Sequence, residues 1–230
     1  MKLACCVRYS GRQKQQVTFD FFNYAGIDRP VVLYTTPSTY INDVTVTTDF
    51  DGTNGFVSYD VFLVGSDAVT ARVSLLDKEG NEVAVDTLLN STLFVQNVNL
   101  WWPYLMDPSP GYLYTLQIQL LDSSGELWDK YSQPVGIRTI SWNENTLQIN
   151  NKPVYLRGFG RHEDSAIRGK GLDLPLILRD HNLIKWIGAN AYRTSHYPYA
   201  EEIMDLADQL GIMIINECPA VGLMYDFALT

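Results

Sequence analysis

The sequence predicts an antiparallel β-sandwich followed by a parallel β/α region, and two observations lead to this fold class. Up to about Ile137, short apolar runs alternate with polar turn signals, which is typical of antiparallel sandwiches. After Thr139, the order becomes strand, helix, strand, helix, strand. That order indicates parallel strand pairing with right-handed crossovers.

The first region is expected to contain short strands separated by polar turns. Residues 44–48 alternate apolar and polar side chains, as a half-buried strand does. Turn sequences follow at 77–81 (Asp-Lys-Glu-Gly-Asn) and at 122–125 (Asp-Ser-Ser-Gly). Strands are therefore predicted at 17–21, 31–34, 44–48, 56–64, 71–76, 83–85, 93–95 and 112–121.

The second region begins after an Asn-Asn turn at 150–151. Asp173 can cap the start of one helix, and Gly211 is a normal stop for another. The run 212–215 is apolar throughout, as expected of a strand covered on both faces. The predicted elements are strands at 153–158, 189–194 and 212–215 and helices at 174–187 and 200–210.

Composition and charge exclude several classes of protein. The 230 residues suffice for one large domain or two modest ones, and 46% are apolar, so disorder is not expected. The net charge is −9 and the 17 basic residues are scattered, which argues against nucleic acid as a partner. No apolar run approaches the length that spans a bilayer, so no membrane partner is expected.

Cysteine and histidine spacing predicts neither a disulfide framework nor a metal site. Cys5 and Cys6 are neighbours that could pair only with strain. The histidines His162, His181 and His196 lie far apart along the chain, without zinc-ligand spacing. We therefore expect no metal and no cofactor.

Signals for the cellular compartment conflict. The apolar stretch 3–7 is too short for the centre of a signal peptide. However, Asn90-Ser91-Thr92 matches the N-glycosylation acceptor, which is used only in the secretory pathway. Such triplets are common by chance, so the sequence alone leaves both the modification and the compartment open.

Two stretches of the second region carry a family resemblance. Residues 190–199 read Asn-Ala-Tyr-Arg-Thr-Ser-His-Tyr-Pro-Tyr, which matches the first signature of glycoside hydrolase family two. Residues 157–164 read Arg-Gly-Phe-Gly-Arg-His-Glu-Asp, which indicates the glucuronidase branch of that family. Further matching stretches are Asp208 with 211–215, 167–171, 19–26 and 99–104.

From Val17 onward, the chain therefore resembles the β-glucuronidases of glycoside hydrolase family two. The resemblance implies a jelly-roll sugar-binding domain, then an immunoglobulin-like sandwich, then a catalytic (β/α)8 TIM barrel. By this correspondence, residues 1–36 are a remnant of the jelly roll, 37–138 the complete sandwich, and 139–230 the N-terminal third of the barrel. A complete barrel needs about 250 residues, so the chain is expected to carry only part of one.

The resemblance also implies a reaction, the retaining hydrolysis of O-glycosyl bonds in β-glucuronides during glycosaminoglycan or glucuronide catabolism. Retention requires an acid/base and a nucleophile, two carboxyl groups about 5–5.5 Å apart. In the family these follow the fourth and seventh barrel strands, which places them beyond residue 230. No catalytic residue is therefore assigned, and the chain alone is expected to be inactive. The full-length form is expected to be a lysosomal or secreted homo-oligomer.

Three residues are predicted to contact the sugar. His196 follows a barrel strand, where such barrels build their sites, and the resemblance assigns it a hydrogen bond to a sugar hydroxyl. The alternative is a histidine that only holds the loop. His162 and Asp164 follow the first strand and are predicted to face the same pocket. The alternatives there are hydrogen bonds within the loop and, less favoured, a metal.

Four other charged residues lie near these strands. Arg168 and Lys170 could offset the glucuronate carboxylate or be solvated loop charges. Glu217 ends the third strand, where a catalytic acid is sought first, but the resemblance assigns it a supporting role. Arg193 lies on a buried strand and is expected to find partners inside the barrel.

The aromatic stretch at 101–104 could stack on sugars but is expected to fill the scaffold. Two further hypotheses for the chain remain open at this point. One is a non-catalytic binding or interaction module built on the sandwich. The other is a product without a stable fold, because an unfinished barrel exposes apolar strand edges.

Overall fold

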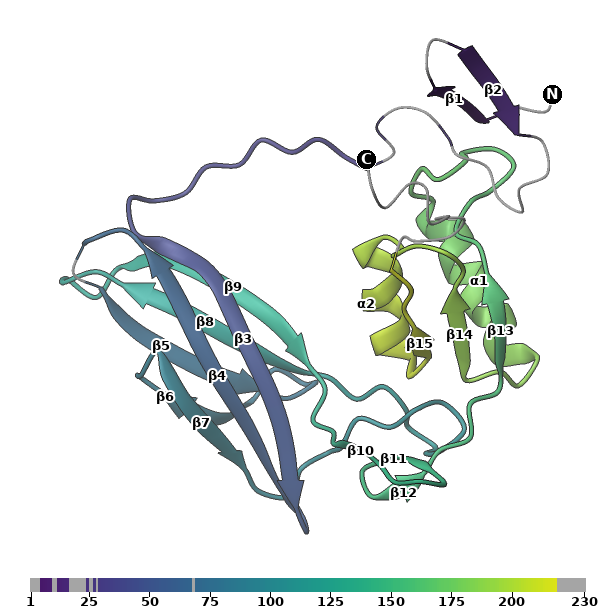
Figure 1. Cartoon of the computed structure of the whole chain (residues 1–230). Helices are drawn as coiled ribbons and strands as arrows, with labels where there is room; N and C mark the ends of the chain where they lie inside the picture. The colour runs from purple at the N-terminus through teal and green to yellow at the C-terminus, as the bar shows by residue number, and fades with distance from the viewer. Residues whose placement is uncertain are drawn as a thin grey trace.

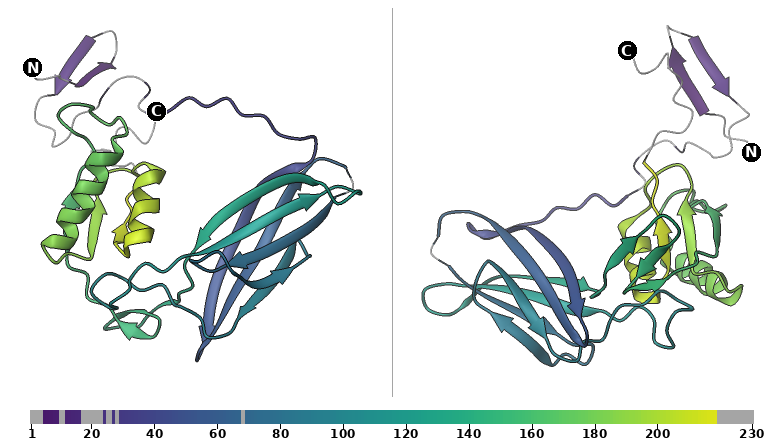
Figure 2. Two further views of the ribbon diagram at one scale, coloured as in Figure 1. Left: turned by 180° about the vertical axis from the view of Figure 1, so that it is seen from behind. Right: turned by 60° about the horizontal axis from the view of Figure 1, so that its bottom comes forward.

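The computed structural model describes residues 5–9, 12–16, 24, 27, 29–67 and 69–218. A β-sandwich is followed by the first strands and helices of a parallel barrel, and the two regions lie side by side (Figure 1). Residues 29–39 form an extended connection that starts beside the β/α region and ends at the first sandwich strand (Figure 2). The predicted fold class is therefore confirmed.

The sandwich consists of two antiparallel sheets whose strands alternate between buried and exposed side chains. The pattern is strict along β8, where every second residue is buried. This period of two follows from the pleat, which points successive side chains to opposite faces. One sheet has the order β3 (Tyr40–Asp51), β4 (Asn54–Val64), β7 (Asn90–Val95), and the other β6 (Glu82–Asp86), β5 (Thr70–Leu76), β8 (Tyr114–Leu121), β9 (Leu127–Val135).

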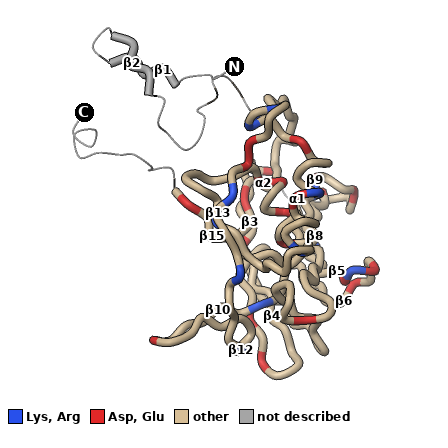
Figure 3. The backbone as a smooth tube through the Cα atoms, turned by 90° about the vertical axis from the view of Figure 1, so that its right-hand side faces the viewer, with Lys and Arg blue, Asp and Glu red and all other residues tan. Residues whose placement is uncertain are grey.

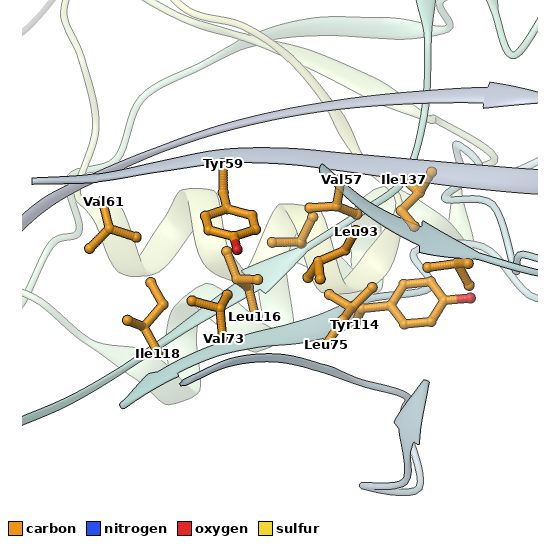
Figure 4. Packing of buried hydrophobic residues seen from close by; sticks show 12 residues of the cluster. Val57, Tyr59, Val61, Val73, Leu75, Leu93, Tyr114, Leu116, Ile118 and Ile137 are labelled. Carbon is orange, nitrogen blue, oxygen red and sulfur yellow. The ribbon is translucent and has the colours of Figure 1, made fainter. Parts of the chain in front are cut away.

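The core of the sandwich lies between these sheets. Val57 and Tyr59 point from β4 toward Val73 and Leu116 on the facing sheet (Figure 4). Leu75, like Val73 and Leu116, is fully buried. Burying a side chain of this size contributes about 1.5–3 kcal/mol, so the two facing sheets supply most of the stability of this region.

The β/α region has three parallel strands and two helices. Asp173 caps the first helix by accepting a hydrogen bond from the Leu176 backbone N–H at 3.2 Å, as predicted. Gly211 ends the second helix with a left-handed φ of 71°, which glycine adopts without strain. The elements are β13 (Gly158–Arg161), α1 (Leu174–Trp186), β14 (Ala191–Thr194), α2 (Glu201–Leu210) and β15 (Met213–Ile215), with sheet order β13-β14-β15.

Trp101 joins the two regions. Its side chain is 1% exposed, and its indole N–H donates to the Asp208 carbonyl of α2 at 2.8 Å. The Arg138 guanidinium lies 4.4 Å from the centre of the same ring. Nearby, the Tyr104 N–H donates to the Gly211 carbonyl at 2.7 Å. The aromatic stretch therefore belongs to the scaffold, in agreement with the prediction.

Several predicted strands differ from the structure. Residues 31–34 form no strand, and all four side chains are at least 70% exposed, because no neighbouring strand supplies a ladder there. The strand predicted at 153–158 in fact begins at Gly158. Glycine is required at this position, because a Cβ on residue 158 would lie 2.2 Å from the carbonyl oxygen of its pairing partner Ala191. The strand predicted at 17–21 lies outside the described residues.

The structure also contains strands that the sequence did not predict. The largest is β9, which completes the four-stranded sheet but carries mostly exposed side chains. The others form two small sheets of short strands: β1 (Cys5–Tyr9) with β2 (Arg12–Gln16), and β10 (Ile140–Trp142) with β11 (Leu147–Ile149) and β12 (Lys152–Pro153). Within the described part of the chain, neither helix has the length and apolar content needed to cross a membrane.

Candidate functional site

The three parallel strands bring the predicted site residues to one edge of the sheet. Arg161 pairs with Thr194, so the residues that follow β13 and β14 emerge beside one another. The His162 and His196 rings accordingly lie 5.5 Å apart between centroids, tilted by 58°. Two of the three predicted sugar contacts therefore converge at the carboxyl ends of the strands, where barrel enzymes place their sites.

His196 is held in an uncommon backbone conformation. Its φ is 80°, in the left-handed region that few residues other than glycine adopt. Its N–H donates to Glu217 Oε2 at 2.8 Å, and the same oxygen lies 3.9 Å from His196 Nδ1. The side chain is 14% exposed. Contacts from the next strand therefore hold this loop in a conformation that costs of order 1–3 kcal/mol.

Glu217 acts in this structure as an ionised acceptor. Its Oε1 accepts a hydrogen bond from Arg193 Nε, and its own N–H donates to Thr194 Oγ1 at 2.9 Å. The hydrogen bond from Arg193, then that from the His196 N–H, holds the Glu217 pKa below its usual range. A carboxylate with a lowered pKa is a poor proton donor, which supports the supporting role over that of a catalytic acid. Arg193 has the carboxylate partner that a strand arginine was expected to need.

The loop after β13 divides its two carboxylates between different partners. The Glu163 side chain is 3% exposed and accepts two hydrogen bonds from Arg29 Nη2, each 3.0 Å long. Glu163 Oε2 also accepts from the Ala200 N–H at the start of α2, at 3.1 Å. Asp164 instead accepts from the Tyr24 hydroxyl at 3.3 Å. Glu163 therefore joins the loop to Arg29 and to the start of α2, while Asp164 contacts Tyr24. Both Arg29 and Tyr24 come from the N-terminal segment.

The two basic residues of the loop also have local partners. The Lys170 ammonium lies 3.6 Å from the centre of the Tyr197 ring. Arg168 Nε lies 3.1 Å from Asp173 Oδ2, and the Arg168 side chain is 60% exposed. A role of these cations toward a glucuronate carboxylate stays a prediction. Along the backbone of the described residues, acidic and basic positions are interspersed (Figure 3).

Sequence reasoning missed the contribution of Tyr24 and Arg29. Both lie more than 130 positions before the loop they contact, and neither follows a predicted strand of the barrel. Only the family match at 19–26 pointed to this segment, without indicating its partner. Among the described residues, no group of three or more His, Cys, Asp or Glu side chains is arranged to hold a metal ion.

A β-sandwich followed by parallel strands with histidines and carboxylates at their carboxyl ends is the architecture of a sandwich domain that precedes the start of a (β/α)8 barrel. Two family profiles match the chain: residues 39–138 match the model described as glycosyl hydrolases family 2, and residues 140–228 match the TIM barrel domain of the same family. The chain belongs to glycosyl hydrolase family 2.

Its relatives include β-glucuronidases. The chain is 54% identical over 212 residues to beta-glucuronidase of Canis lupus familiaris and 52% identical over 211 residues to that of Homo sapiens, in each case over 91% of the chain. It spans about a third of the length of these relatives (33% and 32%).

Solved structures show the same similarity. The beta-D-glucuronidase of Dictyoglomus thermophilum superposes with a TM-score of 0.83 at 46% identity, over 97% of this chain and 37% of that one. The Ruminococcus gnavus enzyme in complex with D-glucuronic acid gives 0.82 at 37% identity, over 96% of this chain and 37% of that one.

Proposed function

We propose that the protein containing this chain is a retaining β-glucuronidase that releases glucuronate from β-glucuronides. The observation that carries the proposal is the convergence of His162 and His196 at the carboxyl ends of β13 and β14, within a chain about half identical to β-glucuronidases. A relative from Ruminococcus gnavus has been solved with D-glucuronic acid. The substrate proposed here is therefore a β-linked glucuronide.

Within the proposed reaction, residues of this chain bind the sugar and do not transfer the proton. His196 and His162 supply imidazole groups that can hydrogen-bond sugar hydroxyls, and Asp164 supplies an acceptor. Glu217 is engaged by Arg193 and the His196 N–H, so it positions the histidine. The acid/base and the nucleophile are proposed to lie outside the described residues. The protein is further proposed to be a lysosomal or secreted homo-oligomer, following the family resemblance.

The test compares the 230-residue chain with the product of the complete gene, using a fluorogenic β-glucuronide. We expect turnover by the complete product and none by the chain alone. In the complete product, His196→Ala should reduce kcat/KM by about 10²–10³-fold, the effect of removing one positioned hydrogen-bond donor. Thr47→Ala, on the exposed face of β3, is the matched control and should leave turnover unchanged.

Turnover by the repurified 230-residue chain, lost again on His196→Ala, would contradict the assignment of the catalytic carboxylates. Unchanged kcat/KM in the complete His196→Ala protein would contradict the assignment of His196 to sugar binding.

A non-catalytic binding module is the second candidate, and the self-contained core of the sandwich favours it. The buried cluster of this region is drawn entirely from residues between Val57 and Ile137, so it needs nothing from the barrel strands. This candidate predicts that carbohydrate binding does not depend on His196. Calorimetric titration of a glucuronide into the wild type and His196→Ala separates the two, because only the glucuronidase site should lose affinity.

A further inference from the structure

The outer face of the β3-β4-β7 sheet carries an asparagine whose surroundings suit a covalent sugar. Asn90 is the first residue of β7, an edge strand of this sheet. Strand β7 lies on the side of the sandwich away from α1 and α2 (Figure 1). Its side chain is exposed, as are those of Thr92 and Phe94. The alternate residues Leu93 and Val95 are buried in the core. The pleat therefore points Asn90 to solvent.

The side-chain amide of Asn90 is not used by the fold. No hydrogen bond within the described residues involves this carboxamide, whereas its neighbour Ser91 donates to Asp86 Oδ2 at 2.6 Å. The backbone around Asn90 is held by strand pairing, in which Asn90 pairs with Asp60 and the Val61 N–H donates to the Leu89 carbonyl at 2.8 Å, and the Asn90 side chain takes no part in it. A substituent on the amide nitrogen would therefore cost no internal contact. It would also meet no packed side chain of the core.

We propose that Asn90 is an N-glycosylation site. The triplet Asn90-Ser91-Thr92 supplies the asparagine and the hydroxyl residue two positions later that the acceptor motif requires. The donor is an oligosaccharide linked through pyrophosphate to a membrane lipid. The Asn90 amide nitrogen forms a bond to the anomeric carbon and loses one proton, while the carbon–oxygen bond to pyrophosphate breaks and the lipid pyrophosphate leaves.

The modification precedes folding, so the folded sandwich has only to accommodate the product. Asn90 pairs with Asp60 across the sheet, and Phe62 is the next outward residue along β4. Such diagonal neighbours lie roughly 7–8 Å apart, within reach of the first sugar. Phe62 is 47% exposed and Phe94 52%. The glycan thus covers an apolar part of the sheet face and keeps that face out of contacts between copies of the chain.

This inference rests on the proposed lysosomal or secreted location, but its test is independent of catalysis. The native protein is captured from its own cells with an antibody against residues 39–138, digested, and the peptide containing Asn90 is analysed by mass spectrometry. Treatment with an N-glycosidase that converts linked asparagine to aspartate marks the occupied site. We expect a glycan on Asn90 in most copies.

Variants of the complete gene product sharpen the result. Asn90→Gln and Thr92→Ala should each remove the glycan, while Thr92→Ser, which retains the hydroxyl, should keep it. Asn42→Gln is the matched control, an exposed asparagine of the same sheet without the triplet, and should leave the glycan in place.

An unmodified Asn90 in native protein would overturn the proposal, whether or not other asparagines carry sugar. Glucuronide turnover is measured on the same samples, so the two proposals fail separately. An active protein with bare Asn90 overturns only the glycosylation, and a glycosylated protein without turnover overturns only the proposed activity.

Discussion

The sandwich and the β/α region bury their apolar residues in different ways. In the sandwich, two sheets face each other and fully bury residues such as Val57, Leu75 and Leu116 between them. In the β/α region, β13 and β15 are the outer strands of the described sheet, and Phe159 and Ile215 remain 43% and 51% exposed. A two-layer antiparallel unit therefore completes its core from its own strands. Parallel strands depend on contacts from elsewhere.

The β/α region is nevertheless stabilised by its contact with the sandwich around Trp101, which we call the seam. Trp101 is buried there, with the Arg138 guanidinium over its ring and its indole N–H bonded to α2. Desolvation lowers the Arg138 pKa and raises that of Asp208, and the attraction between the two charges opposes both shifts. The side chain of Asp208 still reaches solvent on one side. The seam is the place where the two regions can be separated experimentally.

The largest expected effect is that of Trp101→Ala. Removing this ring should cost about 3–5 kcal/mol, because a buried cavity replaces the contact between the regions. We expect the β/α region to unfold before the sandwich, giving two transitions in urea followed by circular dichroism. Trp101→Phe is the control and should cost about 1 kcal/mol, since it loses the hydrogen bond and keeps a ring. One unchanged cooperative transition in Trp101→Ala would show that the seam does not couple the regions.

A smaller effect should distinguish the two cores directly. Leu116→Ala in the sandwich and Ile203→Ala in α2 remove similar volumes from sites that are at most 1% exposed. Large-to-small changes in cores cost about 2–5 kcal/mol, depending on how far the site can collapse. We expect Leu116→Ala near the top of that range and Ile203→Ala near the bottom, because the open sheet can relax. Equal losses in chemical denaturation would contradict this difference between the regions.

The smallest expected effect is a pH dependence confined to the β/α region. His181 is fully buried, its Nδ1 lies 2.8 Å from the Ile177 carbonyl oxygen, and its Nε2 lies 3.3 Å from the Tyr192 hydroxyl. Burial lowers the His181 pKa, the hydrogen bond with the Ile177 carbonyl opposes this shift, and the charges of Arg161 and Asp180 make smaller contributions of opposite sign.

The sign of that dependence follows from proton binding. The unfolded histidine has a pKa of about 6.5 and takes up a proton before the folded one does. The contribution of neutral His181 to the free energy of unfolding should therefore be complete above about pH 6.5. It should decrease as the pH drops toward the pKa of the folded state. His181→Gln should flatten this part of the profile, and Asn182→Gln, at the exposed neighbouring position, should not. If the free energy of unfolding of His181→Gln fell with pH at the same slope, groups other than His181 would cause the loss of stability.

Much of the fold could be predicted because its signals are local. The alternation along residues 44–48 and 56–64, the cap at Asp173 and the stop at Gly211 each depend on residues within one or two turns of chain. The predictions were wrong or incomplete where pairing decided the outcome. Residues 31–34 have strand-like composition but no partner, and β9 has mostly exposed side chains but completes a sheet.

The candidate site shows the same division. The sequence by itself determined the family, through the motif around His196, and placed His162 and His196 after parallel strands. Only the tertiary structure decided which charged and polar groups are in contact. It paired Glu163 with Arg29 and Asp164 with Tyr24, and it placed Arg193 and the His196 N–H on Glu217. The physical reason is that the apolar periods of strands and helices depend on residues close together in the sequence. The partner of a charged side chain depends instead on how the whole backbone folds.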